Sequence, residues 1–226
     1  LVVVGNVERP VLERAVTRTL GTLPRGAYVW SLPPVLKPPA PDLAVAHRTL
    51  PTNYIRGFFA GPQRNSPDFP AFDFAMQVLG SLIGSRVRGT GALSYSAGAS
   101  LVSQGASAGQ IFVSTSRPDT VMKLINSAID DLASNVAFPR YVLTDAANSY
   151  TSAYTRMIES GADYADLLAR AQLYGGDYRS AAQYRDLLRK VVPSDLKKAV
   201  DVYARNIQWG FVGDSTKVPR DLMVKR

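Results

Sequence analysis

The clearest hydrophobic pattern in the chain lies between residues 119 and 132. Apolar side chains recur there at the spacing of one helical face: Val121, Leu124, Ile125, Ala128, Ile129 and Leu132. A second segment, Ala92 to Val102, alternates between apolar and small or polar residues, with Leu93, Tyr95, Ala97, Ala99 and Leu101 on one side. The first pattern predicts an amphipathic helix, and the second predicts a strand with one packed face.

The other elements follow from the same two patterns. Apolar, β-branched or aromatic runs predict further strands at residues 1–4, 54–60, 110–116 and 207–212. Helical spacing predicts helices at residues 10–20, 69–83, 138–159, 162–174 and 179–190, and one more that begins at Pro193 and Asp195. Because amphipathic helices must cover an apolar surface, we expect an α+β fold, a sheet with helices packed on one face.

Prolines mark a boundary near the N-terminus. Six of them lie between residues 24 and 41, which favours an extended, stiff connection. Two short echoes suggest a duplicated α+β unit: Val4-Gly5-Asn6 and Val212-Gly213-Asp214 each follow an apolar run, and an Arg-Pro pair opens a helix at Arg9 and at Arg117. We therefore predict a terminal strand-helix piece of a preceding half-domain at 1–24, a Pro-rich linker at 25–42 and a nearly complete half-domain at 43–226, all within a longer protein.

The composition excludes several classes of catalytic site. One His (His47), three Glu and no Cys are too few ligands for a zinc or iron site in this chain. A serine nucleophile would need His47 as its base, and no nucleophile elbow surrounds any serine. The Gly-rich stretch 84–98 has neither the Walker lysine nor the dinucleotide-binding fingerprint. We expect no metal, no nucleotide and no hydrolytic triad.

The net charge of +8 raises another possible function, that of a basic nucleic-acid-binding module. The basic residues are scattered, however, and the densest stretch, Arg179 to Lys198, places them at helical spacings typical of a solvated helix face. No apolar run approaches the roughly 18 residues of a membrane span. Charge and hydropathy therefore predict neither nucleic acid nor a membrane as a partner.

The segment from Leu82 to Ser100 carries the most chemistry. A helix end, a Gly-rich turn and a strand bring Arg88 and Tyr95 together, and Arg86 is a second cation two positions earlier. Tyr95 falls on the apolar side of its predicted strand, so it could equally be a packed core tyrosine. Arg88 could simply bond the last carbonyl groups of the helix. The residues alone leave both interpretations open.

This segment resembles the C-terminal, non-zinc half of the pitrilysin/insulinase-like zinc metallopeptidases, whose catalytic halves carry an inverted H-x-x-E-H motif. The non-zinc halves have an Arg and a Tyr seven positions apart around a Gly-containing turn, as Arg88 and Tyr95 are here. The stretch Leu1–Val7, the Pro-rich linker and Val192–Leu196 follow in the family's order. The chain departs from the family at Ala92, where Gly is usual, and at residues 89–91, where a charged turn is usual, so the loop is expected to be more mobile.

The resemblance implies a metallopeptidase half-domain that positions peptides for a zinc-dependent endopeptidase. Arg88 and Tyr95 would hold the substrate carbonyl group, and Arg86, Gly91 and Ser94 would be further substrate-binding positions. Because no H-x-x-E-H occurs in the chain, the zinc would be held by the N-terminal half or by a separate catalytic subunit. The implied compartment is a bacterial periplasm. The alternative is a catalytically inactive member that acts as a structural or assembly subunit.

Overall fold

The structure is a computed structural model that describes residues 1–34, 40–89, 91–134 and 140–225. Its centre is a five-stranded sheet in the order β1-β5-β2-β4-β3. The strands are β1 (Asp42–His47), β2 (Asn53–Ala60), β3 (Ala97–Gln104), β4 (Ala106–Thr115) and β5 (Gln208–Gly213). The edge strand β1 pairs with β5 in parallel, and the remaining neighbours are antiparallel.

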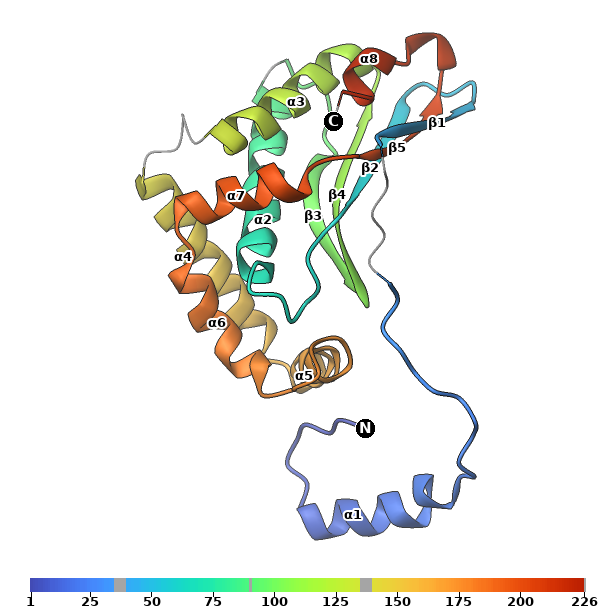
Figure 1. Cartoon of the computed structure of the whole chain (residues 1–226), viewed down its shortest axis with the longest axis vertical. Coiled ribbons are helices and arrows are strands. Elements are labelled where there is room, and N and C mark those ends of the chain that lie inside the picture. The colour runs from blue at the N-terminus through green and yellow to red at the C-terminus, as the bar shows by residue number, and fades with distance from the viewer. Residues whose placement is uncertain (35–39, 90, 135–139, 226) are drawn as a thin grey trace.

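Helices cover one face of this sheet (Figure 1). They are α2 (Phe69–Gly89), α3 (Pro118–Ser134) and α7 (Pro193–Tyr203). The sheet side chains that face them are fully buried or nearly so, as at Ile55, Ile111 and Phe211. Tyr54 and Phe58 alternate with buried residues along β2 and are 51% and 40% exposed. The expected α+β fold, a sheet with helices on one face, is confirmed.

Of three further helices, two pack on the side of α2 away from the sheet and the third, α5 (Gly161–Gly175), lies below α2 near the lower end of β3 and β4 (Figure 1). The first two are α4 (Arg140–Met157) and α6 (Ser180–Lys190), and a short α8 (Arg220–Met223) follows the sheet near the C-terminus. The first residues of the helix predicted at 138–159 lie outside the described residues. Helix α7 begins as predicted, because the Asp195 carboxylate accepts a hydrogen bond from the Val192 backbone N–H at 3.0 Å.

Glycine allows α2 to lie directly on β3. A Cβ atom at Gly80 would be 2.4 Å from the backbone oxygen of Ala99, which is closer than atoms can pack. The predicted helix at 69–83 is too short, since α2 continues to Gly89. The predicted strand at 92–102 is too long at its start, because β3 begins only at Ala97. Residues 92–96 therefore belong to the connection between these two elements.

The N-terminal residues differ most from the sequence prediction. Helix α1 (Arg9–Arg18) forms, but none of its residues is buried and it lies apart from the sheet in Figure 1. Residues 1–4 are not a strand, and Leu1 is 84% exposed. A strand needs a hydrogen-bonded neighbour, and the described residues provide none for this segment. Strand β1 was not predicted at all, although Leu43 and Val45 alternate in it.

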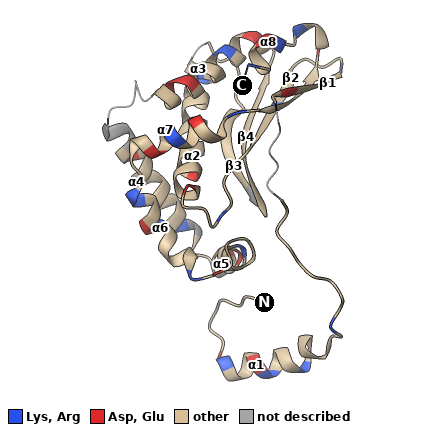
Figure 2. Cartoon of the chain, in the orientation of Figure 1, with Lys and Arg blue, Asp and Glu red and all other residues tan. Residues whose placement is uncertain are grey.

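Lysine and arginine are interleaved with acidic residues over most helices (Figure 2). Several of these charges form i,i+4 ion pairs along one helix, as Lys123 with Asp119 at 2.7 Å and Arg170 with Asp166 at 2.6 Å. The scattered charge predicted from the sequence is therefore seen in the fold. Within the described part of the chain, no helix has both the length and the apolar character needed to cross a membrane.

Candidate functional site

The turn between α2 and β3 carries the residues that the sequence singles out. Gly91 and Ala92 both have left-handed backbone conformations, with φ of 71° and 51°. The Ala92 N–H donates to the Arg88 carbonyl at 3.2 Å, and the Leu93 N–H donates to the Val87 carbonyl at 3.1 Å. These bonds end the helix and reverse the chain. The Ala that replaces the family's usual Gly thus occupies a conformation that favours glycine.

The residues after the reversal are fixed to the end of β4. The Thr115 hydroxyl donates to the Leu93 carbonyl at 2.9 Å, and the Ser114 N–H donates to the Ser96 carbonyl at 3.1 Å. The Ser94 hydroxyl donates to the Ser96 carbonyl and accepts from the Ser96 N–H, both at 3.0 Å. Ser94 is buried and its hydroxyl stabilises the turn. Its substrate-binding role, like that of Gly91, stays a prediction.

Tyr95 lies between these anchored residues and is 95% exposed. The prediction that it shares a packed strand face with Leu93 and Ala97 is wrong, and with it the interpretation as a core tyrosine. The physical reason is that the strand begins only at Ala97, so the alternation of a strand does not apply at Tyr95. Its phenol group is held on a fixed piece of backbone and points to solvent.

The two arginines near the end of α2 have different environments. The Arg86 guanidinium donates to the Ser127 hydroxyl at 3.0 Å and forms a 2.5 Å ion pair with Asp131, both on α3. Arg88 is exposed, and no carboxylate of a described residue forms an ion pair with it. The structure therefore places Arg88 at the end of α2 and Tyr95 just before β3, and no hydrogen bond between described residues joins their side chains. The Arg88 guanidinium lies back along α2, with a nitrogen 2.8 Å from where a Cβ atom at Gly84 would be, whereas Arg86 joins α2 to α3.

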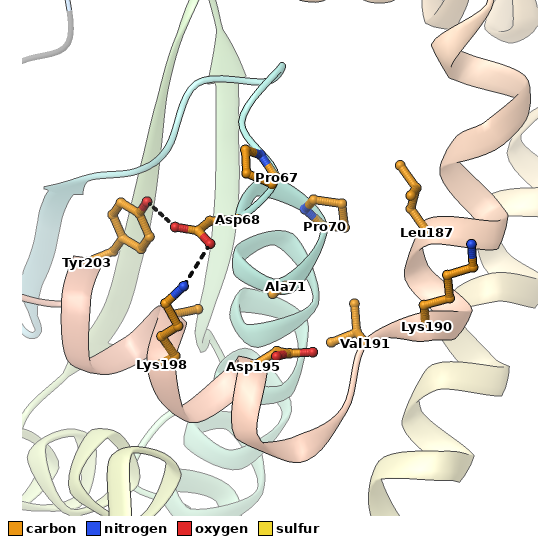
Figure 3. Close-up of a pocket in the computed structure, with 11 residues that line it drawn as sticks. Pro67, Asp68, Pro70, Ala71, Leu187, Lys190, Val191, Asp195, Lys198 and Tyr203 are labelled. Atoms are coloured by element: carbon orange, nitrogen blue, oxygen red, sulfur yellow. Dashed lines mark hydrogen bonds and ion pairs between the residues drawn. The ribbon is translucent and has the colours of Figure 1, made fainter.

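A pocket of about 240 Å³ lies between the start of α2 and the helices α6 and α7 (Figure 3). Asp68 accepts a hydrogen bond from the Tyr203 hydroxyl at 3.0 Å and forms an ion pair with Lys198 at 3.3 Å. Burial and the Asp68 carboxylate raise the pKa of Tyr203 to about 12. Asp195, which also lines this pocket, caps α7. Three of the four charged side chains that line this pocket thus already have partners within the protein. The pocket therefore has few charged groups left to bind a ligand.

A buried carboxylate and two tyrosines form a cluster that the sequence did not predict. Asp73 on α2 is 5% exposed, and its Oδ2 accepts hydrogen bonds from the hydroxyls of Tyr150 (2.6 Å) and Tyr184. Burial raises the pKa of Asp73, and burial together with the Asp73 charge raises the pKa of both tyrosines. A single Asp inside the apolar helix pattern at 69–83 was the available signal in the sequence.

The described residues do not fit a zinc ion. Nowhere in residues 1–34, 40–89, 91–134 and 140–225 do three His, Cys, Asp or Glu side chains cluster as metal ligands would. The one histidine, His47, has its Nδ1 3.0 Å from the Ser215 hydroxyl. No step of a reaction can therefore be assigned to a metal held by these residues. Zinc in a partner half stays a proposal.

Comparison with solved structures shows the same fold in peptidase-related proteins. A protease from Helicobacter pylori matches 93% of this chain and 53% of its own length, with a TM-score of 0.80 and 17% identity. A peptidase M16 inactive domain from Pseudomonas fluorescens matches with a TM-score of 0.79 and 17% identity over 93% of this chain and 52% of its own. The chain thus spans about half the length of these proteins.

A chain of a solved multi-chain complex has the same fold. A chain of complex III from Candida albicans matches 92% of this chain and 53% of its own length, with a TM-score of 0.75 and 15% identity. No curated protein is significantly similar to this chain in sequence. The family model of the peptidase M16 inactive domain, by contrast, matches residues 1–149, which include α2, the turn with Arg88 and Tyr95, and β3. The chain therefore belongs to the peptidase M16 inactive domain family.

Proposed function

We propose that this chain is the non-zinc half of a zinc-dependent endopeptidase and that Arg88 and Tyr95 contact the carbonyl group of a peptide substrate. The observation that carries the proposal is the exposure of Tyr95, 95%, on a turn whose flanking residues are hydrogen-bonded to β4. A large aromatic side chain held in solvent contributes little to the stability of the fold. Its fixed position instead suits contact with a ligand.

The chemistry of the pair fits a carbonyl group that gains negative charge. A guanidinium and a phenol are both hydrogen-bond donors, and the guanidinium is also a permanent cation. Donors that are fixed before the reaction stabilise a developing oxyanion without paying for reorganisation. The backbone on both sides of Tyr95 is anchored, which limits the region that its hydroxyl can reach.

The remaining parts of the enzyme would come from elsewhere. The chain spans about half the length of its structural relatives, and its described residues do not form a metal site. The zinc and the general base would be supplied by an N-terminal half, or by a separate subunit, that carries H-x-x-E-H. The half-domain formed by this chain would then form one wall of the active site and position the peptide. A periplasmic location stays a prediction.

The test compares variants of the protein together with its zinc-bearing half. We expect Tyr95→Phe and Arg88→Ala each to lower the turnover of a peptide by about 10²–10³, the usual loss for one oxyanion donor. The melting temperature should not change, because both side chains are exposed. The matched control is Tyr28→Phe, which removes the hydroxyl of another exposed tyrosine, 83% exposed, outside the turn. Unchanged turnover in Tyr95→Phe would overturn the proposed role of Tyr95.

A structural or assembly subunit is the second candidate, favoured by the likeness to a chain of complex III. In that case the intact protein or complex would form stably but would contain no stoichiometric zinc and hydrolyse no peptide. Metal analysis and a peptidase assay on the same purified sample distinguish the two candidates. Stoichiometric zinc together with hydrolysis would exclude the purely structural role.

A further inference from the structure

A second pocket, of about 310 Å³, opens beside the Asp73 cluster. It lies where α2, α4, α5 and α6 meet the strand β3. Aromatic rings and carboxylates contribute most of its functional groups: Phe69, Asp73, Tyr150, Tyr154, Asp163 and Tyr184. The volume is large enough for a single extended side chain but not for a folded partner, so the ligand must be small or a protruding group.

The Asp73 carboxylate is only half satisfied by the fold. Both tyrosine hydroxyls donate to Oδ2, and no described residue donates to Oδ1. Among the described side chains, the one polar atom sealed from solvent without a partner is Trp209 Nε1. The Oδ1 atom is therefore not a sealed atom without a partner, and Asp73 is one of the residues that line the pocket. An acceptor in this position favours a ligand that donates hydrogen bonds.

The charged side chains that line the pocket favour a cation as the ligand. Arg170 is neutralised by Asp166 at 2.6 Å. Arg64 lies over the ring of Phe69, with its Cζ 5.5 Å from the ring centroid, and its charge lowers the pKa of Asp73, although no ion pair joins Arg64 to a described carboxylate. When Asp73 is ionised, it and Asp163 outnumber this one remaining cation. Aromatic rings and a carboxylate together are the groups that bind organic cations in proteins.

We propose that this pocket binds a primary ammonium group carried on an alkyl chain, either a lysine side chain or the free amino terminus of a peptide. An ammonium group has three donors, and it would give one to Asp73 Oδ1 and could give others to the tyrosine hydroxyl oxygens. The ammonium chemistry rests on the pocket alone. The choice of a peptide as its carrier rests on the proposed function.

The test is isothermal titration of the intact chain with three short peptides of equal length. The first has a lysine and an acetylated amino terminus, the second has norleucine and a free amino terminus, and the third has norleucine and an acetylated amino terminus. We expect the first or the second to bind at least about tenfold more tightly than the third, and the stronger of the two identifies the source of the ammonium group. Equal affinities for all three would overturn the proposal.

Two variants assign the binding to Asp73. Asp73→Asn keeps the shape and an acceptor for the tyrosines but removes the charge, and it should weaken the preferred peptide about tenfold. The matched control is Asp68→Asn, which makes the same change at a second tyrosine-bonded aspartate outside this pocket and should leave binding unchanged. Equal binding by Asp73→Asn and wild type would also overturn the proposal. If Asp73→Asn does not fold, the norleucine comparison on the wild type still decides the question.

The outcome is separable from that of the proposed function. The preference for an ammonium group is assigned through Asp73, and neither Arg88 nor Tyr95 lines this pocket. A chain that prefers the ammonium peptides while its reconstituted complex hydrolyses nothing would support the pocket and contradict the peptidase. A complex that hydrolyses peptides, of a chain that binds all three peptides equally, would support the peptidase and contradict the ammonium pocket.

Discussion

The turn after α2 and the Asp73 cluster use tyrosine hydroxyls in opposite ways. At the turn, backbone, serine and threonine groups make the hydrogen bonds, and Tyr95 is left 95% exposed. At the cluster, Tyr184 is buried, Tyr150 is partly buried, and both hydroxyls donate to one carboxylate. The difference shows that a side chain becomes available for a ligand when the surrounding backbone is held by other groups. The predictions below test each side of this comparison.

The largest change in stability is expected at the cluster, between Asp73→Ala and Asp73→Asn. Both variants remove the charge, but only Asn keeps an acceptor for the two tyrosine hydroxyls. An unsatisfied buried hydroxyl costs about 1–3 kcal/mol, and Tyr184 is the buried tyrosine of the two, so the free energy of unfolding of Asp73→Ala should be about 1–3 kcal/mol lower than that of Asp73→Asn. Urea unfolding of both proteins measures this difference. Tyr95→Ala, by comparison, should lie within about 0.5 kcal/mol of the wild type.

Equal stabilities of Asp73→Ala and Asp73→Asn would mean that the hydroxyls find other acceptors. The hydroxyls of Tyr150 and Tyr184 would then contribute no more to stability than the exposed hydroxyl of Tyr95.

The same cluster predicts a pH dependence. Burial raises the pKa of Asp73, so the folded chain binds this proton more tightly than the unfolded chain, whose pKa is near 3.8. The contribution of Asp73 to stability is therefore greatest below the unfolded pKa and is lost as the pH rises through the folded one. Melting curves of wild type and Asp73→Asn between about pH 3 and pH 8 should show the wild type losing stability relative to the variant. Parallel curves would contradict the raised pKa.

A smaller effect separates the two arginines at the end of α2. Arg86→Ala removes the partly buried ion pair with Asp131, in which the two side chains are 25% and 38% exposed, and should cost about 1 kcal/mol. Arg88→Ala removes an exposed cation and should change the free energy of unfolding by less than about 0.5 kcal/mol. Denaturant unfolding of the two variants measures both. The opposite order would mean that Arg88, not Arg86, joins α2 to its neighbours.

The smallest effect is expected at Ala92, whose φ of 51° is costly for a residue with a Cβ atom. Ala92→Gly relieves this cost but makes the unfolded chain more flexible, so we expect a net gain of about 0.5 kcal/mol. Gly89→Ala is the control, since a Cβ atom there would meet nothing within 4 Å and φ is not left-handed. A loss of stability in Ala92→Gly would show that the turn is not strained.

Periodicity alone predicted most elements because it records which face of each is buried. The stripe from Val121 to Leu132 became α3, and Pro193 and Asp195 began α7. The same reasoning failed at residues 92–96, where an alternating pattern continued through a turn. The two left-handed residues and the bonds to Val87 and Arg88 decide the local structure there, and hydropathy does not report them.

By itself the sequence determined the fold class, the scarcity of His and Cys as metal ligands and the seven-residue spacing of Arg88 and Tyr95. These follow from composition and from local patterns that hold wherever the segment lies. Only the tertiary structure decided that Tyr95 faces solvent, that Arg86 is engaged by α3, and that Asp73 meets tyrosines 77 and 111 residues away. Exposure and long-range hydrogen bonds depend on how the helices pack around the sheet, and local periodicity does not contain that information.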